Sequence, residues 1–148
     1  MEAVMKLEEI FEEWKKDSQI DRTELGEESL KIPKLHHKYF QIYSNEKLLL
    51  RKYEAEFKKL KLEKHEFYTQ GHNEETRSKG WSLPAKGLIL KADIPMYMEA
   101  DTDIINMSLK IGYLQEKIEL LESIIKSLTN RGYSIKTAVD WARFTMGA

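Results

Sequence analysis

The sequence predicts an all-α protein built from long helices, with a heptad helix in its C-terminal part. Apolar residues recur every three or four positions over long stretches, which is typical of amphipathic helices. The segment 70–87 holds three Gly and one Pro and separates two helical regions. With 3 Trp, 7 Tyr and 5 Phe, the helices of one 148-residue monomer cannot easily bury all their apolar stripes. We therefore expect self-association, as a dimer or as a closed ring.

The first sixteen residues are expected to form an amphipathic helix. Their apolar positions are spaced by three, four and three, and acidic side chains lie between them. These positions are Val4, Leu7, Phe11 and Trp14. Asp17 and Ser18 are expected to end this helix.

A short second helix and a long third helix are expected to follow. Asp21 with Glu24 three residues later resembles a capping pair, which predicts a helix running to about Lys31. Pro33 is expected to interrupt it, because proline has no amide hydrogen for the helix interior. A new helix would begin directly afterwards and keep helical apolar spacing to about Thr69.

Residues 70–100 are expected to connect the two helical regions. The part up to residue 87 predicts a mobile loop, because it is polar and rich in glycine. The following stretch "LILKADIPMYM" fits either a short strand or an extended connector, and Pro95 excludes a long strand. Asp101 is expected to cap the start of the next helix.

The strongest periodicity in the chain lies between residues 104 and 128. Spacings of three and four alternate over four heptads, which predicts a coiled-coil seam with Ile at every a position and Met or Leu at every d position. The predicted oligomerisation residues are Ile104, Met107, Ile111, Leu114, Ile118, Leu121, Ile125 and Leu128. Leu120 and Ile124 widen this apolar face, which favours a bundle or a multi-subunit contact over an isolated dimer.

The C-terminal end is expected to form a separate short helix. Asn130 and Gly132 predict a stop in the heptad helix, and Ser134 can cap a new one. Trp141 and Phe144 would supply its apolar contacts.

Charge is strongly polarised along the chain although the net charge is only -1. Residues 1–30 carry four Lys and Arg against ten Asp and Glu, whereas residues 31–64 carry ten against four. The remaining residues, 65–148, are nearly balanced, with ten against eleven. A concentrated basic segment indicates an anionic polymer as a partner.

The basic segment reaches its highest density in "RKYEAEFKKLKLEKHEFY", residues 51–68. On a helix its cations follow one stripe beside an apolar face, and Lys64 breaks that face. Cationic stripes combined with aromatic rings bind single-stranded nucleic acid without sequence preference. The candidate DNA-binding residues are Lys47, Arg51, Lys58, Lys59, Lys61, Lys64, Phe67 and Tyr68.

Two alternatives to this interpretation stay open. The cations can form an ordinary solvated helix face while the aromatic rings pack in the core, because both arrangements are common. The whole chain would then be a non-enzymatic helical scaffold or chaperone-like oligomer without DNA binding. Binding that weakens with salt distinguishes the two functions, since only DNA binding releases counterions.

Catalytic, cofactor and metal sites are not predicted. The sequence contains no phosphate-binding loop and no dinucleotide-binding glycine motif, so we expect neither an enzyme nor a cofactor. There is no cysteine, and no pair of the 4 His residues has ligand spacing on a helix, so no metal site is expected. The apolar runs are too short for a membrane span, and a soluble intracellular protein is expected.

Three segments, in this order, resemble the UvsY recombination mediator family of T-even-type bacteriophages. They are "KLEEIFEEWKKDSQID", "RKYEAEFKKLKLEKHEFYTQG" and "RGYSIKTAVDWARFTMG". The resemblance covers most of the chain and implies a single UvsY-like domain over residues 1–148. Its helices with the basic stripe would span 1–69, the connector 70–100 and the oligomerisation helices 101–148.

The resemblance also implies a function and partners. It implies a ring-like homo-oligomer, with a heptamer as one candidate size, that binds single-stranded DNA in the cytoplasm of an infected bacterium. The ring would load a UvsX-type recombinase onto strands covered by the phage single-stranded-DNA-binding protein. The acidic first helix, or the loop around Trp81, would contact protein partners.

The family's DNA-contacting motif is a Lys-x-Arg pair in the middle basic segment. Here Lys64 stands at the second position, and Leu62 replaces the first lysine, with Lys61 one place earlier. The resemblance therefore implies Lys58, Lys61 and Lys64 as a set of DNA contacts.

Overall fold

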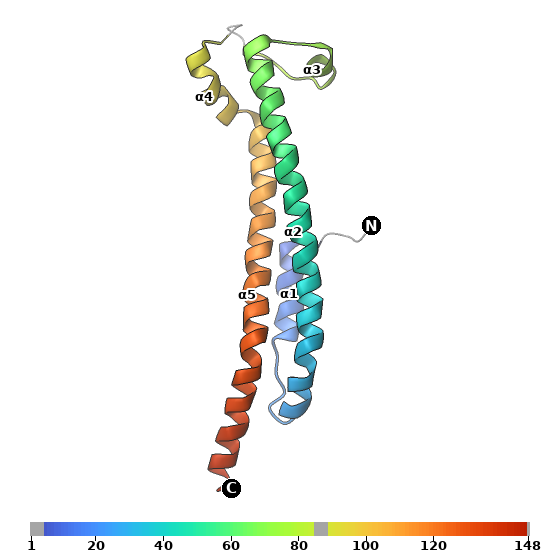
Figure 1. Ribbon diagram of the computed structural model, residues 1–148, viewed down its shortest axis with the longest axis vertical. Helices are drawn as coiled ribbons and strands as arrows, with labels where there is room; N and C mark the ends of the chain where they lie inside the picture. Colours follow the sequence, from blue (N-terminus) through green and yellow to red (C-terminus); the bar gives the residue numbers. More distant parts are fainter. Residues whose placement is uncertain (1–4, 85–88, 148) are drawn as a thin grey trace. The chain divides into compact units, whose positions relative to one another are not determined.

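The computed structural model describes residues 5–84 and 89–147 and contains only helices and connecting turns in these ranges. This confirms the predicted fold class, all-α. The chain divides into two compact units, Met1–Leu48 with Leu114–Ala148 and Leu49–Tyr113, and two long helices belong to both (Figure 1). The elements are α1 (Leu7–Asp17), α2 (Leu25–Gln70), α3 (Glu74–Ser78), the 3-10 turn η1 (Lys91–Asp93), α4 (Ile94–Glu99) and α5 (Thr102–Thr145).

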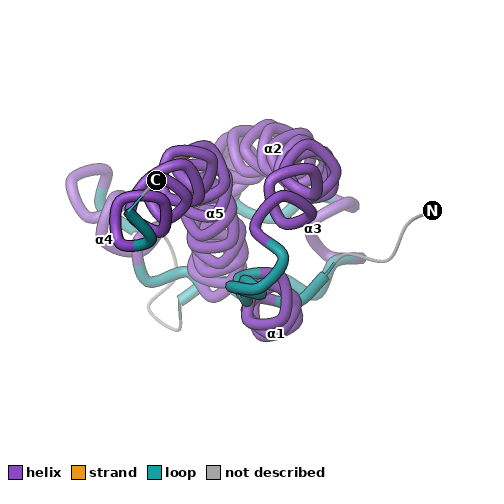
Figure 2. Tube along the Cα trace, turned by 90° about the horizontal axis from the view of Figure 1, so that it is seen from below, coloured by secondary structure: helices purple, strands orange, loops and turns teal. Residues whose placement is uncertain are grey.

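The unit formed by Met1–Leu48 and Leu114–Ala148 is a three-helix packing of α1 with the first part of α2 and the last part of α5. Figure 2 shows the same three helices along their axes, with α1 beside the other two. Its core contains the fully buried side chains Ile10, Tyr39, Leu121, Ile124 and Leu128. Helix α1 is thus held by apolar contacts with two partners rather than by its own propensity.

The apolar face predicted for α1 needs one correction. Phe11 is 53% exposed, whereas Ile10, one position earlier, is completely buried. Leu7, Ile10 and Trp14 keep spacings of three and four, so the buried face is still a helical stripe. Val4 lies outside the described residues.

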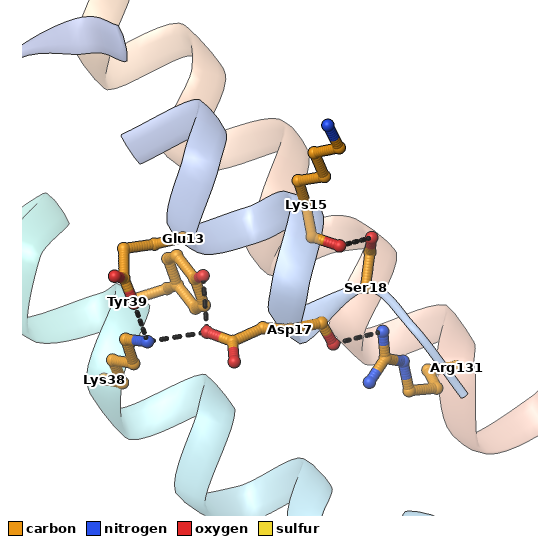
Figure 3. A network of polar contacts seen from close by, with 7 residues as sticks. All are labelled: Glu13, Lys15, Asp17, Ser18, Lys38, Tyr39 and Arg131. Atoms are coloured by element: carbon orange, nitrogen blue, oxygen red, sulfur yellow. Dashed lines mark hydrogen bonds and ion pairs between the residues drawn. The ribbon is translucent and has the colours of Figure 1, made fainter. Parts of the chain in front are cut away.

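A polar network holds the end of α1 against both long helices (Figure 3). The Asp17 carboxylate accepts hydrogen bonds from Lys38 Nζ at 2.6 Å and from the Tyr39 hydroxyl at 2.7 Å. Its backbone carbonyl accepts a bond of 3.0 Å from Arg131 Nη2. Burial alone would raise the pKa of Asp17, but the bonds from Lys38 and Tyr39 outweigh it and hold the pKa below its usual value.

The unit Leu49–Tyr113 consists of the end of α2, the short helices α3 and α4, and the start of α5. Its buried apolar side chains are Phe67, Tyr68, Ile94, Ile104 and Ile111. The start of α5 is capped as predicted, because Asp101 Oδ1 accepts the backbone amide of Ile104 at 3.1 Å.

Helix α2 is continuous where an interruption was expected. It includes Pro33, and it begins at Leu25, so the predicted short helix ending near Lys31 is wrong. Pro33 is exposed, and water can therefore reach the carbonyl that the missing amide leaves without a partner. Asp21 does not pair with Glu24 as expected; its carboxylate accepts bonds from the amide and hydroxyl of Thr23 at 2.9 and 2.6 Å.

The connector 70–100 is more ordered than the sequence suggests. Helix α3 interrupts the predicted mobile loop, and Asn73 caps it by accepting the Thr76 amide at 2.8 Å. The stretch for which strand and extended connector were both considered forms η1 and α4 instead, with Pro95 in the first turn of α4. Residues 85–88 lie outside the described part.

Helix α5 continues to Thr145, so the predicted stop at Asn130 and Gly132 is wrong. Leu128 is completely buried on one side of this point, and Ile135 is buried on the other. Packing on both sides therefore offsets the ~1 kcal/mol by which glycine disfavours a helix interior.

Replacing Gly132 with Ala is expected to raise the free energy of unfolding by up to about 1 kcal/mol. A Cβ at this position would meet only Ile32 Cδ1, at 4.0 Å, which is an ordinary contact distance. Urea denaturation followed by circular dichroism measures the change. A loss of stability would mean that the helix is not continuous at this residue.

Candidate nucleic-acid interface

Exposed cations line one side of α2 within the unit Leu49–Tyr113. Arg51, Lys58 and Lys61 are exposed at positions that follow helical spacing, with Glu54 between the first two. Lys52 and Lys59 are exposed on the neighbouring edge. We call Arg51, Lys52, Lys58, Lys59 and Lys61 the basic face. Within residues 5–84 and 89–147, no carboxylate lies at ion-pair distance from any of these five side chains.

The aromatic rings next to the basic face are partly covered by lysine side chains. Lys61 Nζ lies 4.2 Å from the centroid of the Phe57 ring, and Lys110 Nζ lies 4.1 Å from that of Tyr53. Such cation–π contacts stabilise by about 0.5–1 kcal/mol at exposed sites. They hold the ammonium groups close to the helix surface.

Lys64 does not belong to the basic face. Its side chain is buried, and its ammonium group lies 3.1 Å from Asp101 Oδ2 and 2.8 Å from Asp103 Oδ2. It also lies 3.8 Å from the centroid of the Trp81 ring. Lys64 therefore neutralises two carboxylates at the start of α5 and is not exposed to a phosphate in this structure.

Phe67 and Tyr68, the predicted stacking residues, are also buried in this unit. They are 2% and 8% exposed, and Phe67 packs against Trp81 with ring centroids 5.4 Å apart. The Tyr68 hydroxyl donates a bond of 2.6 Å to Asp101 Oδ2. Burial, first, and this bond, second, raise the pKa of Tyr68. Neither ring presents a free face to a nucleobase.

Lys47, the remaining predicted cation, lies in the other unit. It is half-buried, and its ammonium group lies 5.2 Å from the centroid of the Tyr43 ring. A pair that sequence reasoning missed lies close by in the same unit. Lys117 Nζ and Glu46 Oε2 are 2.9 Å apart, and both residues are at most 4% exposed.

The predicted heptad seam lies largely inside the single chain. Its six buried residues are Ile104, Ile111, Leu114, Ile118, Leu121 and Leu128. The other two, Met107 and Ile125, are half-buried. Most of this apolar surface is already covered by the chain's own helices.

The end of α5 carries the apolar surface that the chain itself leaves uncovered. Trp141, Phe144 and Met146 are 65%, 74% and 81% exposed. The Trp141 and Phe144 rings stack on each other with centroids 5.7 Å apart. Large apolar side chains gathered at this exposure are typical of a contact surface.

Neither a metal site nor a membrane span is found among the described residues. No group of three potential ligand side chains in these ranges could hold a metal ion. None of the helices there is both long enough and apolar enough to cross a bilayer.

Known proteins match this chain over nearly its whole length. It is 24% identical over 144 residues to the recombination protein uvsY of Enterobacteria phage T4, covering 97% of this chain and 99% of the relative. Crystal structures of the bacteriophage T4 recombination mediator protein UvsY share the fold. One has a TM-score of 0.79 at 25% identity, covering 96% of this chain and 98% of its own. Another has a TM-score of 0.77 at 23% identity, covering 95% and 99%.

A family model also matches this chain, over residues 13–148. It therefore contains the basic face, the Lys64 cluster and the exposed end of α5. The family is described as the recombination, repair and ssDNA-binding protein UvsY. The chain belongs to the UvsY family of recombination, repair and single-stranded-DNA-binding proteins.

Proposed function

We propose that this protein is a recombination mediator, which binds single-stranded DNA and promotes loading of a UvsX-type recombinase onto strands covered by the phage single-stranded-DNA-binding protein. The observation that carries this proposal is the basic face on α2, whose five cations have no carboxylate partner among the described residues. Exposed unpaired cations on one helix side attract phosphates without reading sequence.

The DNA contacts are assigned to the basic face rather than to the whole predicted set. Arg51, Lys58, Lys59 and Lys61 are exposed and are retained. Lys64 is bound to Asp101 and Asp103, so its charge is already neutralised.

The protein acts through binding free energy alone. A mediator without nucleotide turnover shifts the competition for a strand only by binding one state of it better than another. Weak sites on several subunits hold one strand tightly by effective concentration, yet release it one site at a time. Such release suits a step-by-step transfer of DNA to the recombinase in the cytoplasm of the infected host.

The multimer required for this mechanism is a ring-like homo-oligomer, with a heptamer as the size we expect. Its contact surface includes the exposed aromatic end of α5, Trp141 and Phe144, because most of the heptad seam is covered within one chain. A contact between two different surfaces of neighbouring copies closes into a ring when its rotation permits. The exposed acidic side chains of α1, such as Glu8 and Glu12, remain available for protein partners.

A salt series with a labelled single-stranded oligonucleotide tests the proposal. Replacing Arg51, Lys58 and Lys61 with Ala is expected to weaken binding and to make the slope of log affinity against log salt shallower by about 2 per subunit engaged, since each lost phosphate contact contributes ~0.7. The control replaces Lys16, Lys34 and Lys136, which are exposed elsewhere, and removes the same charge.

The same two variants distinguish a mediator from a scaffold. Recombinase activity on strands covered by the single-stranded-DNA-binding protein is expected to be stimulated by the wild type and the control, but not by the variant of the basic face. Equal slopes and equal stimulation for both variants would show that the basic face is an ordinary solvated surface.

A further inference from the structure

A cavity of about 730 Å³ lies beside the basic face in the unit Leu49–Tyr113. One wall is α2, through Lys61 and His65, and the opposite wall is the segment from Ile89 to Glu99 together with the start of α5. Its walls are largely apolar, with Ile94 and Met98 among the lining residues. This volume falls in the range of pockets that hold small organic ligands.

Cations surround this apolar cavity. Lys61, which belongs to the basic face, lines it from α2, and Lys91 lines it from the opposite wall. Both side chains are exposed. Glu99 also lines the cavity and is the carboxylate among its lining residues. An apolar partner alone would leave the charges of the two lysines unmatched, whereas a ligand with a flat apolar part and an anionic backbone matches both features.

The aromatic rings of α2 in this unit are poorly placed to stack on bases. Phe67 and Tyr68 are buried, and lysine ammonium groups lie over Phe57 and Tyr53. Yet the affinity of sequence-tolerant single-strand binding usually comes from bases as well as from phosphates. The cavity is the large apolar surface next to the basic face that can supply this part.

We propose that the cavity receives an unstacked nucleobase of a DNA single strand whose phosphates lie against Lys61 and Lys91. The proposal rests on the proposed function and adds a base-binding site to it. The apolar walls cover the faces of the base, and the carboxylate of Glu99 and the His65 ring offer polar partners to its edge. A base in a duplex is paired and stacked, so the cavity favours single strands over duplex DNA.

Oligonucleotides without bases test this proposal directly. Affinity is measured for a thymidine oligonucleotide, for an abasic oligonucleotide of the same length, and for a duplex. The wild type is expected to bind the intact strand about 5- to 150-fold more tightly than the abasic strand, the range that one stacked base contributes. It is also expected to bind the duplex more weakly than the single strand.

A matched pair of variants places this effect in the cavity. Met98→Gln puts a polar group of nearly the same size into the wall, and it is expected to remove most of the intact-to-abasic ratio. Met96→Gln changes a residue of the same helix that is 62% exposed and does not line the cavity, and it is expected to keep the ratio. Lys91→Ala is expected to keep the ratio while making the salt slope shallower by about 0.7.

The outcomes separate this inference from the proposed function. Equal affinity of the wild type for intact and abasic strands overturns the base site while DNA binding stands. A change of particle mass in light scattering for Met98→Gln, with the base ratio unchanged, would show that a second copy of the chain fills the cavity. Absence of any binding to the intact strand at low salt would instead remove the proposed function itself.

Discussion

Replacing Lys117 with Met is expected to lower the free energy of unfolding by about 3–5 kcal/mol. Lys117 is 1% exposed, and its ammonium group lies 2.9 Å from Glu46 Oε2 and donates a bond of 3.0 Å to the Met5 carbonyl. Methionine fills a similar volume but leaves the Glu46 carboxylate buried without its cation. Urea denaturation at fixed protein concentration measures the loss, since self-association makes apparent stability depend on concentration.

Two further variants define what the loss means. Adding Glu46→Leu to Lys117→Met is expected to restore most of the stability, because a well-packed apolar pair often replaces a buried ion pair without cost. Lys126→Met changes an exposed lysine of the same helix, and it is expected to stay within about 0.5 kcal/mol of the wild type. If Lys117→Met behaved like Lys126→Met, the pair could not be buried in solution.

Helix type and approximate length could be predicted from the sequence because they depend on local periodicity. The end of α2 near Thr69, the cap at Asp101 and the burial of residues such as Leu121 all follow from spacing and cap chemistry. The continuity of α2 through Pro33 and of α5 through Gly132 could not be predicted. At both places the local signal for a break is outweighed by packing against helices that are distant in sequence.

The candidate site was predicted in its cations and missed in its burial. Lys58, Lys59 and Lys61 are exposed as expected, whereas Lys64 is buried. Its position could have shown this, because it continues the apolar register of Phe57 and Leu60 on α2. A lysine in a core register interrupts an apolar stripe in sequence, but it can also mark a buried cation whose carboxylate partners come from another helix. Those partners follow no local pattern and become visible only in the fold.

Replacing Lys64 with Met is expected to lower the free energy of unfolding by about 3 kcal/mol, near the lower end for a broken buried pair. Asp101 keeps the Tyr68 hydroxyl and the Ile104 amide as partners, which limits the loss. In the wild type, burial would raise the pKa of Asp101, but the bonds from these two groups and from Lys64 hold it below its usual value. A depressed pKa stabilises the fold above the ordinary value, and this contribution is lost as pH falls through the folded pKa. The difference between variant and wild type should therefore narrow below about pH 4.

Comparison with Lys61→Met decides whether Lys64 stabilises the fold or contacts DNA. Lys61 is exposed, so its replacement is expected to change stability by less than about 0.5 kcal/mol and to make the salt slope of DNA binding shallower by about 0.7. Lys64→Met, measured where it is fully folded, is expected to keep the wild-type slope, because its charge is already matched by Asp101 and Asp103. A shallower slope for Lys64→Met, with stability unchanged, would mean that the ammonium group leaves its carboxylates to meet a phosphate when DNA binds.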